Sequence, residues 1–139
     1  MSVSLLIVTH GNIGQAILDT ATEIICSSPI ATQVINIDMN GDYDNLLNEV
    51  NATGEKLNTG DGILLLTDLF GATPSNLASA MTNRNCVVVA GLNLPMLIRV
   101  MNYHNLPLYE LSNKAVGGGK DGILAYYLDK DKFQDANTN

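Results

Sequence analysis

The sequence predicts an α/β fold: an open, doubly wound sheet of four parallel strands in the order 2-1-3-4, with helices on both faces. Short continuous apolar runs recur along the chain, and each is followed by a stretch whose apolar residues have helical spacing. Each run also ends at a polar or glycine-containing corner. Such alternation is typical of β-α units joined by right-handed crossovers, which produce a parallel sheet.

The size and composition of the chain fit one compact domain. Its 139 residues are 46% hydrophobic and 15% charged, which is typical of a well-buried globular protein rather than a disordered or fibrous one. We expect a single domain over residues 1–130 and a polar tail over residues 131–139, with no internal repeat or interdomain linker.

Charge and hydropathy exclude several classes of partner. The net charge of -7 repels phosphate backbones and anionic lipid, so we expect no nucleic-acid binding. No apolar stretch approaches the roughly 20 residues of a membrane span, and no signal-peptide pattern is present, so we expect no stable membrane insertion. Cys26 and Cys86 lack metal-type spacing. We interpret both as buried packing residues of a cytoplasmic protein.

The first strand ends at a histidine. Leu5 to Val8 is an apolar run short enough to be a buried strand, and it stops at His10-Gly11. Asn12 or Gly11 then opens a helix with apolar positions at Ile13, Ala16, Ile17, Ala21, Ile24 and Ile25. In an open parallel sheet, ligands bind at this strand-to-helix corner. A histidine that only caps a turn is the alternative interpretation.

A second β-α unit follows the first. Thr32 to Ile37 predicts a strand that ends at Asp38. Apolar positions between Tyr43 and Leu57 predict a helix, whose last turns Gly54 should weaken by up to about 1 kcal/mol.

The third unit has the most explicit helix start. Ile63 to Leu66 predicts a third buried strand, and its polar corner contains Asp68. Thr73 is a suitable N-cap and Pro74 fits the first helical position, so the third helix should run to about Thr82.

The last part of the chain predicts one more unit and a terminal strand. Cys86 to Val89 predicts a fourth strand, and Asn93 is the expected N-cap of a fourth helix. Residues 107–115 predict a short helix. Gly117 to Gly119 should break it and form a flexible hinge into a final strand at Ile123 to Leu128.

The predicted strand order places the His10 corner beside the Asp68 corner. A carboxylate that accepts a hydrogen bond from one imidazole nitrogen fixes the tautomer and leaves the other nitrogen free as a nucleophile. Nearby, the hydroxyls of Thr73 and Ser75 and the helix amides near Pro74 can receive a dianionic phosphoryl group without a metal.

Three motifs at these corners together resemble a known family. They are Ile7-Val8-Thr9-His10-Gly11, Leu66-Thr67-Asp68-Leu69-Phe70-Gly71-Ala72-Thr73-Pro74-Ser75-Asn76 and Ala90-Gly91-Leu92-Asn93-Leu94-Pro95-Met96-Leu97. Over roughly residues 3–128, the chain resembles the EIIA component of the mannose family of the bacterial phosphoenolpyruvate-dependent sugar phosphotransferase system. Each motif alone is weak, but three at the right corners in the right order make a specific match. The family pattern often has Gly-Gly where this chain has Gly71-Ala72.

The resemblance implies an EIIA-like phosphocarrier domain that needs neither a cofactor nor a metal. His10 would be the phosphorylated residue, Asp68 would orient it, and Thr73 would help to hold the phosphoryl group. We add Ser75 and Gly71, from the same corner, as candidate phosphoryl-binding residues.

The resemblance also implies the partners. The phosphoryl group would come from the small carrier HPr and pass to an EIIB component. Because the sequence ends without the EIIB domain that some members carry in fusion, we expect a separate acceptor, or else a regulatory carrier without a dedicated transporter. The resemblance further implies a homodimer, in which the strand at Ile123 to Leu128 pairs with the partner's sheet.

Other classes of protein have reactive residues at the same strand-to-helix corners. A histidine phosphatase needs an arginine beside its histidine, whereas the neighbour here is Thr9. A receiver-type signalling module would be phosphorylated on Asp68, but it needs a Mg²⁺ site with acidic residues after the first strand. The sequence also lacks the glycine-rich phosphate loops of nucleotide-binding proteins. A hydrogen-bonded corner with a purely structural role is the remaining alternative.

Overall fold

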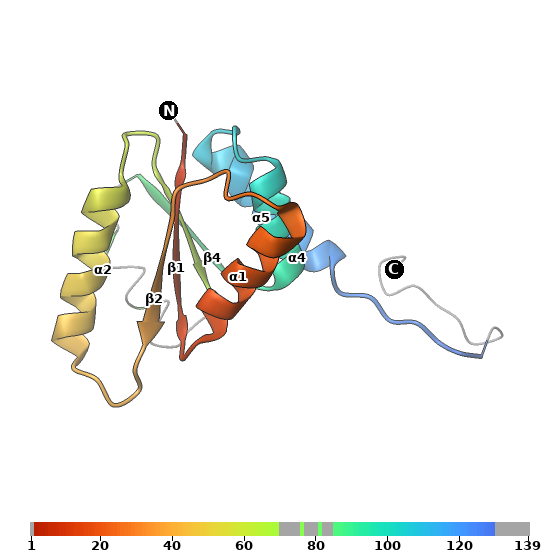
Figure 1. Cartoon of the computed structure of the whole chain (residues 1–139), viewed down its shortest axis with the longest axis horizontal. Coiled ribbons are helices and arrows are strands. Elements are labelled where there is room, and N and C mark those ends of the chain that lie inside the picture. The colour runs from red at the N-terminus through yellow and green to blue at the C-terminus, as the bar shows by residue number, and fades with distance from the viewer. Residues whose placement is uncertain (1, 70–75, 77–80, 82–84, 130–139) are drawn as a thin grey trace.

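The computed structural model describes residues 2–69, 76, 81 and 85–129 (Figure 1). β1 (Ser4–His10) pairs in parallel with β2 (Thr32–Ile37) on one side and with β3 (Ile63–Thr67) on the other. β4 (Cys86–Ala90) pairs in parallel with β3. The strand order β2-β1-β3-β4 confirms the prediction and places the switch point between β1 and β3.

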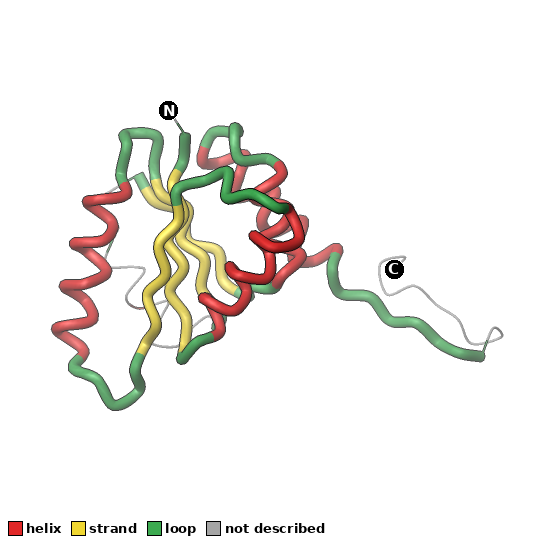
Figure 2. The backbone as a smooth tube through the Cα atoms, in the orientation of Figure 1, coloured by secondary structure: helices red, strands yellow, loops and turns green. Residues whose placement is uncertain are grey.

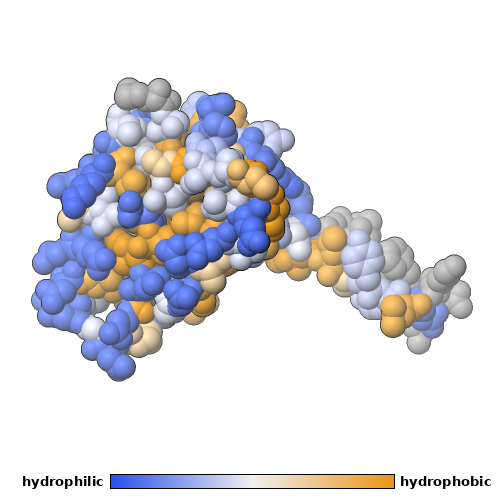
Figure 3. Space-filling model, in the orientation of Figure 1, coloured by the Kyte–Doolittle hydropathy of each residue, from blue (hydrophilic) through white to orange (hydrophobic). Residues whose placement is uncertain are grey.

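Helices cover both faces of this sheet, as predicted. α1 (Ile13–Ile25), α4 (Leu94–Asn102) and α5 (Leu108–Asp121) lie on one face, and α2 (Tyr43–Leu57) lies on the other (Figure 1). Figure 2 shows the strands as the central layer between these helices. On the surface, Figure 3 shows apolar side chains between α1 and α2, with hydrophilic side chains on either side.

The two faces of the sheet bury separate apolar clusters. The central strands β1 and β3 contribute to both, because alternate side chains point to opposite faces. The cluster under α1, α4 and α5 includes Leu5, Ile7, Leu64, Leu66, Leu97, Val100 and Leu111. The cluster under α2 includes Leu6, Val8, Ile35, Ile37, Val50, Ile63 and Leu65. Burial on both faces explains why these strands have continuous rather than alternating apolar sequences.

Asn93 joins two helices as well as starting one. Its side-chain oxygen accepts a hydrogen bond of 2.9 Å from the backbone N–H of Met96, which confirms its prediction as the N-cap of α4. Its amide nitrogen donates a hydrogen bond of 3.1 Å to the carbonyl oxygen of Gly119 in α5. The third motif therefore fixes the packing of α4 against α5.

The predicted glycine hinge is wrong, because α5 continues through Gly117 to Gly119 and ends at Asp121. A Cβ atom added at Gly118 would lie 2.5 Å from the Cβ of Arg99, and one at Gly122 would lie 2.5 Å from the Cγ of Pro95. The glycines therefore let α5 approach α4 at a distance that no side chain permits. This packing outweighs the low helix propensity of glycine.

The segment Ile123 to Leu128 is extended and lies outside the four-stranded sheet (Figure 1). Its large apolar side chains are exposed, among them Tyr126 at 74% and Leu128 at 104%. A strand needs a neighbouring backbone to pair with. The predicted pairing of this segment with a partner's sheet therefore stays a prediction.

The cysteines differ from their prediction as buried residues. Cys26 is exposed at the end of α1, where it adopts a left-handed conformation with φ of 62°. Cys86 is half-buried. A residue in the left-handed conformation has left the helical backbone, so the apolar pattern of the helix does not extend to it.

Most of the predicted third helix, at residues 74–82, lies outside the described residues; Asn76 is helical, and Met81 is buried. None of the helices in the described part of the chain is both long and apolar enough to span a bilayer.

Candidate active site

His10 is the last residue of β1 and lies at the carboxyl edge of the sheet. The six preceding residues of the strand are buried, whereas His10 is half-buried, with 24% of its side chain exposed. The apolar strand therefore delivers the imidazole to the surface at a fixed position. This is the corner at which open parallel sheets bind ligands.

Asp68 follows β3 directly and faces His10, as predicted. Nδ1 of His10 lies 3.1 Å from Oδ2 and 3.3 Å from Oδ1 of Asp68. The backbone N–H of His10 also donates a hydrogen bond of 3.2 Å to Oδ2. Only 13% of the Asp68 side chain is exposed, so water competes weakly for the carboxylate. This contact favours the tautomer with the proton on Nδ1, and it leaves Nε2 with a free lone pair.

The other side of the corner is fixed by Thr9 and Gly14. The buried hydroxyl of Thr9 accepts a hydrogen bond of 2.8 Å from the backbone N–H of Gly14 in the first turn of α1. A Cβ atom at Gly14 would lie 2.7 Å from Thr9 Oγ1 and 2.7 Å from Ile7 Cγ2. Only glycine permits this close approach, which holds the start of α1 against β1 beside His10. Residue periodicity alone did not predict this contact.

Thr67, immediately before Asp68, has a buried side chain whose role the sequence did not reveal. Within the part of the chain that the structure describes, its Oγ1 has no hydrogen-bond partner. Its carbonyl oxygen accepts a hydrogen bond of 3.0 Å from the N–H of Leu92, which ties the β4–α4 corner to β3. Thr67 pairs with Val8 in the sheet, so its side chain shares the α2 face with Val8 and His10.

Three other candidate residues, Thr73, Ser75 and Gly71, lie outside the described residues. Asp38, which ends the second strand, is exposed. Its Oδ1 accepts a hydrogen bond of 2.9 Å from the N–H of Asn40. The structure therefore brings together His10 and Asp68 among the predicted site residues.

Comparison with known proteins identifies the family. The family model EIIA-man, described as PTS system fructose IIA component, matches residues 4–116, which include both the His10 and the Asp68 corners. The chain belongs to this EIIA mannose family.

Relatives and solved structures agree with this membership. The mannose-specific EIIAB component of the phosphotransferase system (PTS) from Escherichia coli K12 is 32% identical over 129 residues. The match covers 90% of this chain and 40% of the relative, so the chain spans about two fifths of the length of the curated relatives it matches first. The fructose-specific EIIA component from Bacillus subtilis is 32% identical over 81 residues, which cover 55% of this chain and 56% of the relative.

Two solved structures have the same architecture. The mannose/sorbose-specific IIA subunit from Enterococcus faecalis superposes with a TM-score of 0.83 at 23% identity, over 94% of this chain and 98% of that chain, and supports the fold. The EIIA component from Streptococcus agalactiae has a TM-score of 0.73 at 28% identity, over 88% of this chain and 96% of that chain.

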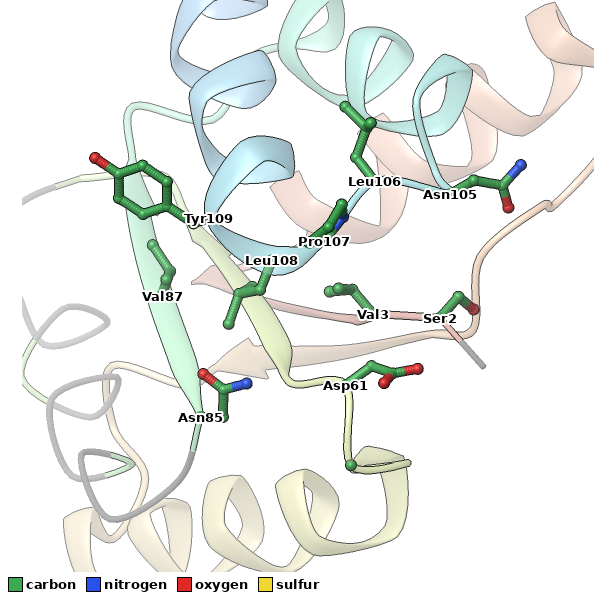
Figure 4. Close-up of a pocket in the computed structure, with 11 residues that line it drawn as sticks. Ser2, Val3, Asp61, Asn85, Val87, Asn105, Leu106, Pro107, Leu108 and Tyr109 are labelled. Atoms are coloured by element: carbon green, nitrogen blue, oxygen red, sulfur yellow. The ribbon is translucent and has the colours of Figure 1, made fainter.

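A large cavity lies at the edge of the sheet opposite His10. Its volume is about 600 Å³, and it lies between the amino ends of the strands and the start of α5 (Figure 4). Three of the residues that line it, Val3, Asp61 and Asn85, come shortly before β1, β3 and β4, respectively. Parallel strands have their amino ends at one edge, opposite the edge with His10. This cavity therefore contributes no group to the candidate active site.

Metal-binding side chains do not gather in the described part of the chain, where no three His, Cys, Asp or Glu residues are close enough to share an ion. The group that His10 meets is instead the carboxylate of Asp68, which suits a histidine that reacts through one of its own nitrogens.

Proposed function

We propose that this chain is a phosphohistidine carrier of a sugar phosphotransferase system. His10 accepts a phosphoryl group from the phosphohistidine of HPr and passes it to an EIIB component. One observation carries the proposal: Asp68 engages Nδ1 of His10 at 3.1 Å and leaves Nε2 as the nucleophile. Membership of the EIIA mannose family supports the partners and a cytoplasmic location.

The transfer exchanges one P–N bond for another. The Nε2 lone pair of His10 attacks the phosphorus, the bond between phosphorus and the donor imidazole breaks, and the electron pair returns to the donor nitrogen. His10 then carries phosphorus on Nε2 and a proton on Nδ1, so positive charge develops on its ring. The Asp68 carboxylate beside Nδ1 stabilises that charge.

Because both bonds are of the same kind, the reaction is nearly isoenergetic. The site then has to hold the donor and acceptor nitrogens in line and to offset the negative charge on the phosphoryl oxygens. We assign this second role to Thr73, Ser75 and Gly71, together with the amides that begin the predicted helix at Pro74. No nucleotide or Mg²⁺ enters this scheme.

We also propose that two copies of the chain form a homodimer through Ile123 to Leu128. This segment exposes five large apolar side chains beyond the end of α5: Ile123, Leu124, Tyr126, Tyr127 and Leu128. β4 is an edge strand of the sheet, and its Val88 is 37% exposed. An open sheet edge is a ready template for a strand from another chain.

The test is incubation with phosphorylated HPr in the absence of ATP and added metal. We expect one phosphoryl group per chain, labile in acid and stable in alkali, as is typical of phosphohistidine. His10→Ala should take up none. His104→Ala changes the other histidine of the sequence and should behave like the wild type. Label that persists in His10→Ala would refute the assignment. A label that alkali removes would indicate an acyl phosphate, as on Asp68.

A further inference from the structure

Two adjoining depressions lie at the corner between β2 and α2. One, of about 420 Å³, is lined by Gly11, Asn36, Ile37, Asp38 and Met39. The other, of about 190 Å³, is lined by Ile37, Asp38, Met39, Gly41, Tyr43 and Leu46. Because both share Ile37, Asp38 and Met39, they form one groove, which we call the β2 groove.

The β2 groove begins next to the candidate active site. Gly11, at one end of it, follows His10 directly and donates a hydrogen bond of 3.2 Å to the carbonyl oxygen of Ile37. His10 itself pairs with Ile37 in the register between β1 and β2. A molecule seated in the groove is therefore in immediate contact with the corner that holds His10.

The groove and its surroundings expose large apolar side chains. Met39 is 71% exposed and Tyr43 is 49% exposed. Ile13, in the first turn of α1, is 46% exposed, and Leu69, beside Asp68, is 58% exposed. Exposed apolar side chains that gather around one site, rather than scattering singly, are typical of a surface that binds another protein.

The charge at the groove is negative. Asp38 lines it, and Asp42 and Asp44 lie at the adjoining start of α2, all three of them exposed. Asp38 and Asp42 each accept a local backbone hydrogen bond, from Asn40 and Asp44, and so stay fixed in position. No Lys, Arg or His is among the described residues that line the groove. The surface therefore favours a basic partner.

We propose that the β2 groove docks the protein that delivers the phosphoryl group to His10, through an apolar side chain flanked by Lys or Arg residues. This inference rests on the proposed function. An in-line attack by Nε2 requires the donor to lie against the carboxyl edge of the sheet, where the groove is continuous with the His10 corner. Apolar contact supplies affinity, and the carboxylates supply orientation and a faster encounter.

Met39→Ser tests the apolar contact. With phosphorylated HPr as the donor, we expect the second-order rate constant for phosphorylation of His10 to fall about tenfold or more, as for a truncated anchor residue in an interface. With phosphoramidate, a small donor that releases ammonia and needs no docking surface, the rate should match the wild type. The control is Ile24→Ser, which truncates a side chain that is 55% exposed in the last turn of α1, far from the His10 edge.

Asp38→Asn tests the charge. The amide oxygen can still accept the hydrogen bond from Asn40, so only the negative charge is lost. Transfer from phosphorylated HPr should slow with rising salt in the wild type and should depend less on salt in Asp38→Asn.

The outcomes separate this inference from the proposed function. If the wild type reacts with both donors and neither variant differs from it, the groove is not the docking surface, while the phosphocarrier function stands. If Met39→Ser slows both donors equally, the change acts on the site, and the docking role is wrong. If the wild type takes up phosphoryl from neither donor, both the function and the docking role fail.

Discussion

The carboxylate of Asp68 holds His10 at two points, because it meets both Nδ1 of the imidazole at 3.1 Å and the backbone N–H at 3.2 Å. The two residues are separated by 58 positions in the sequence and lie at the carboxyl ends of the neighbouring strands β1 and β3. The backbone contact fixes the end of β1, and the side-chain contact fixes the ring. A single carboxylate therefore determines both where the imidazole lies and which nitrogen is free.

Asp68→Asn should slow phosphorylation of His10 by about 10²-fold or more while leaving the fold intact. The amide group can present a donor to Nδ1 and so favour the wrong tautomer, and it brings no charge to stabilise the ring cation. Rapid-quench kinetics with phosphorylated HPr, together with circular dichroism, measures both quantities. Asp61→Asn, at the opposite edge of the sheet, is the matched control and should react at the wild-type rate. Equal rates in wild type and Asp68→Asn would show that the carboxylate does not take part.

Gly118→Ala should reduce the free energy of unfolding by roughly 1–3 kcal/mol, which is typical of overpacking. The added methyl group would lie 2.5 Å from the Cβ of Arg99, so α4 and α5 must move apart. Urea denaturation monitored by circular dichroism measures the change. Gly117→Ala is the control, because its added Cβ atom would lie 3.8 Å from Nη1 of Arg99, an ordinary contact distance, and alanine favours a helix. A stabilised Gly118→Ala protein would contradict the close packing of these helices.

Two buried threonines at strand ends should respond in opposite ways to replacement by valine. Thr9→Val removes the acceptor of the Gly14 N–H and should destabilise the protein by about 1–3 kcal/mol. Thr67→Val removes a buried hydroxyl that has no partner among the described residues, so the free energy of unfolding should stay the same or rise. Thermal and urea unfolding of the two variants provide the comparison. A large loss of stability in Thr67→Val would reveal a hydrogen bond to its hydroxyl.

Removal of the residues after Gly122 should convert a dimer to a monomer and leave α5 in place, since α5 ends at Asp121. The lost segment holds the exposed apolar side chains of residues 123–128. Light scattering of the full chain and of the truncated chain at micromolar concentration measures both states. A full chain that is monomeric under these conditions would refute the exchanged strand.

Much of the fold was predictable, because the central strands β1 and β3 contain unbroken apolar runs and end at polar corners. The ends of β1 and β3 followed from such runs, and adjacency of His10 and Asp68 then followed from the strand order. Asn93 was predictable as a helix cap because its side chain acts on a neighbour three residues away.

What the sequence did not reveal depends on contacts between distant segments. Gly118 was expected to break a helix, since its need for close approach to Arg99 is invisible without the fold. Thr9 and Gly14 are close in the sequence, but their contact depends on how α1 turns back on β1. The β2 groove is likewise made by Gly11 and Met39, which different β-α units bring to one edge. Tertiary packing determines each of these features, and local propensity does not report it.

We propose that Asp68 occupies Nδ1 of His10 and leaves Nε2 to carry the phosphoryl group. The most direct test is a two-dimensional ¹H–¹⁵N spectrum of the ¹⁵N-labelled protein before and after phosphorylation by HPr, which identifies the ring nitrogen bonded to phosphorus. We expect phosphorus on Nε2 of His10, with Nδ1 still protonated. Phosphorus on Nδ1 would show that Asp68 does not direct the reaction to Nε2, and an unchanged His10 ring in a phosphorylated chain would show that another residue carries the phosphoryl group.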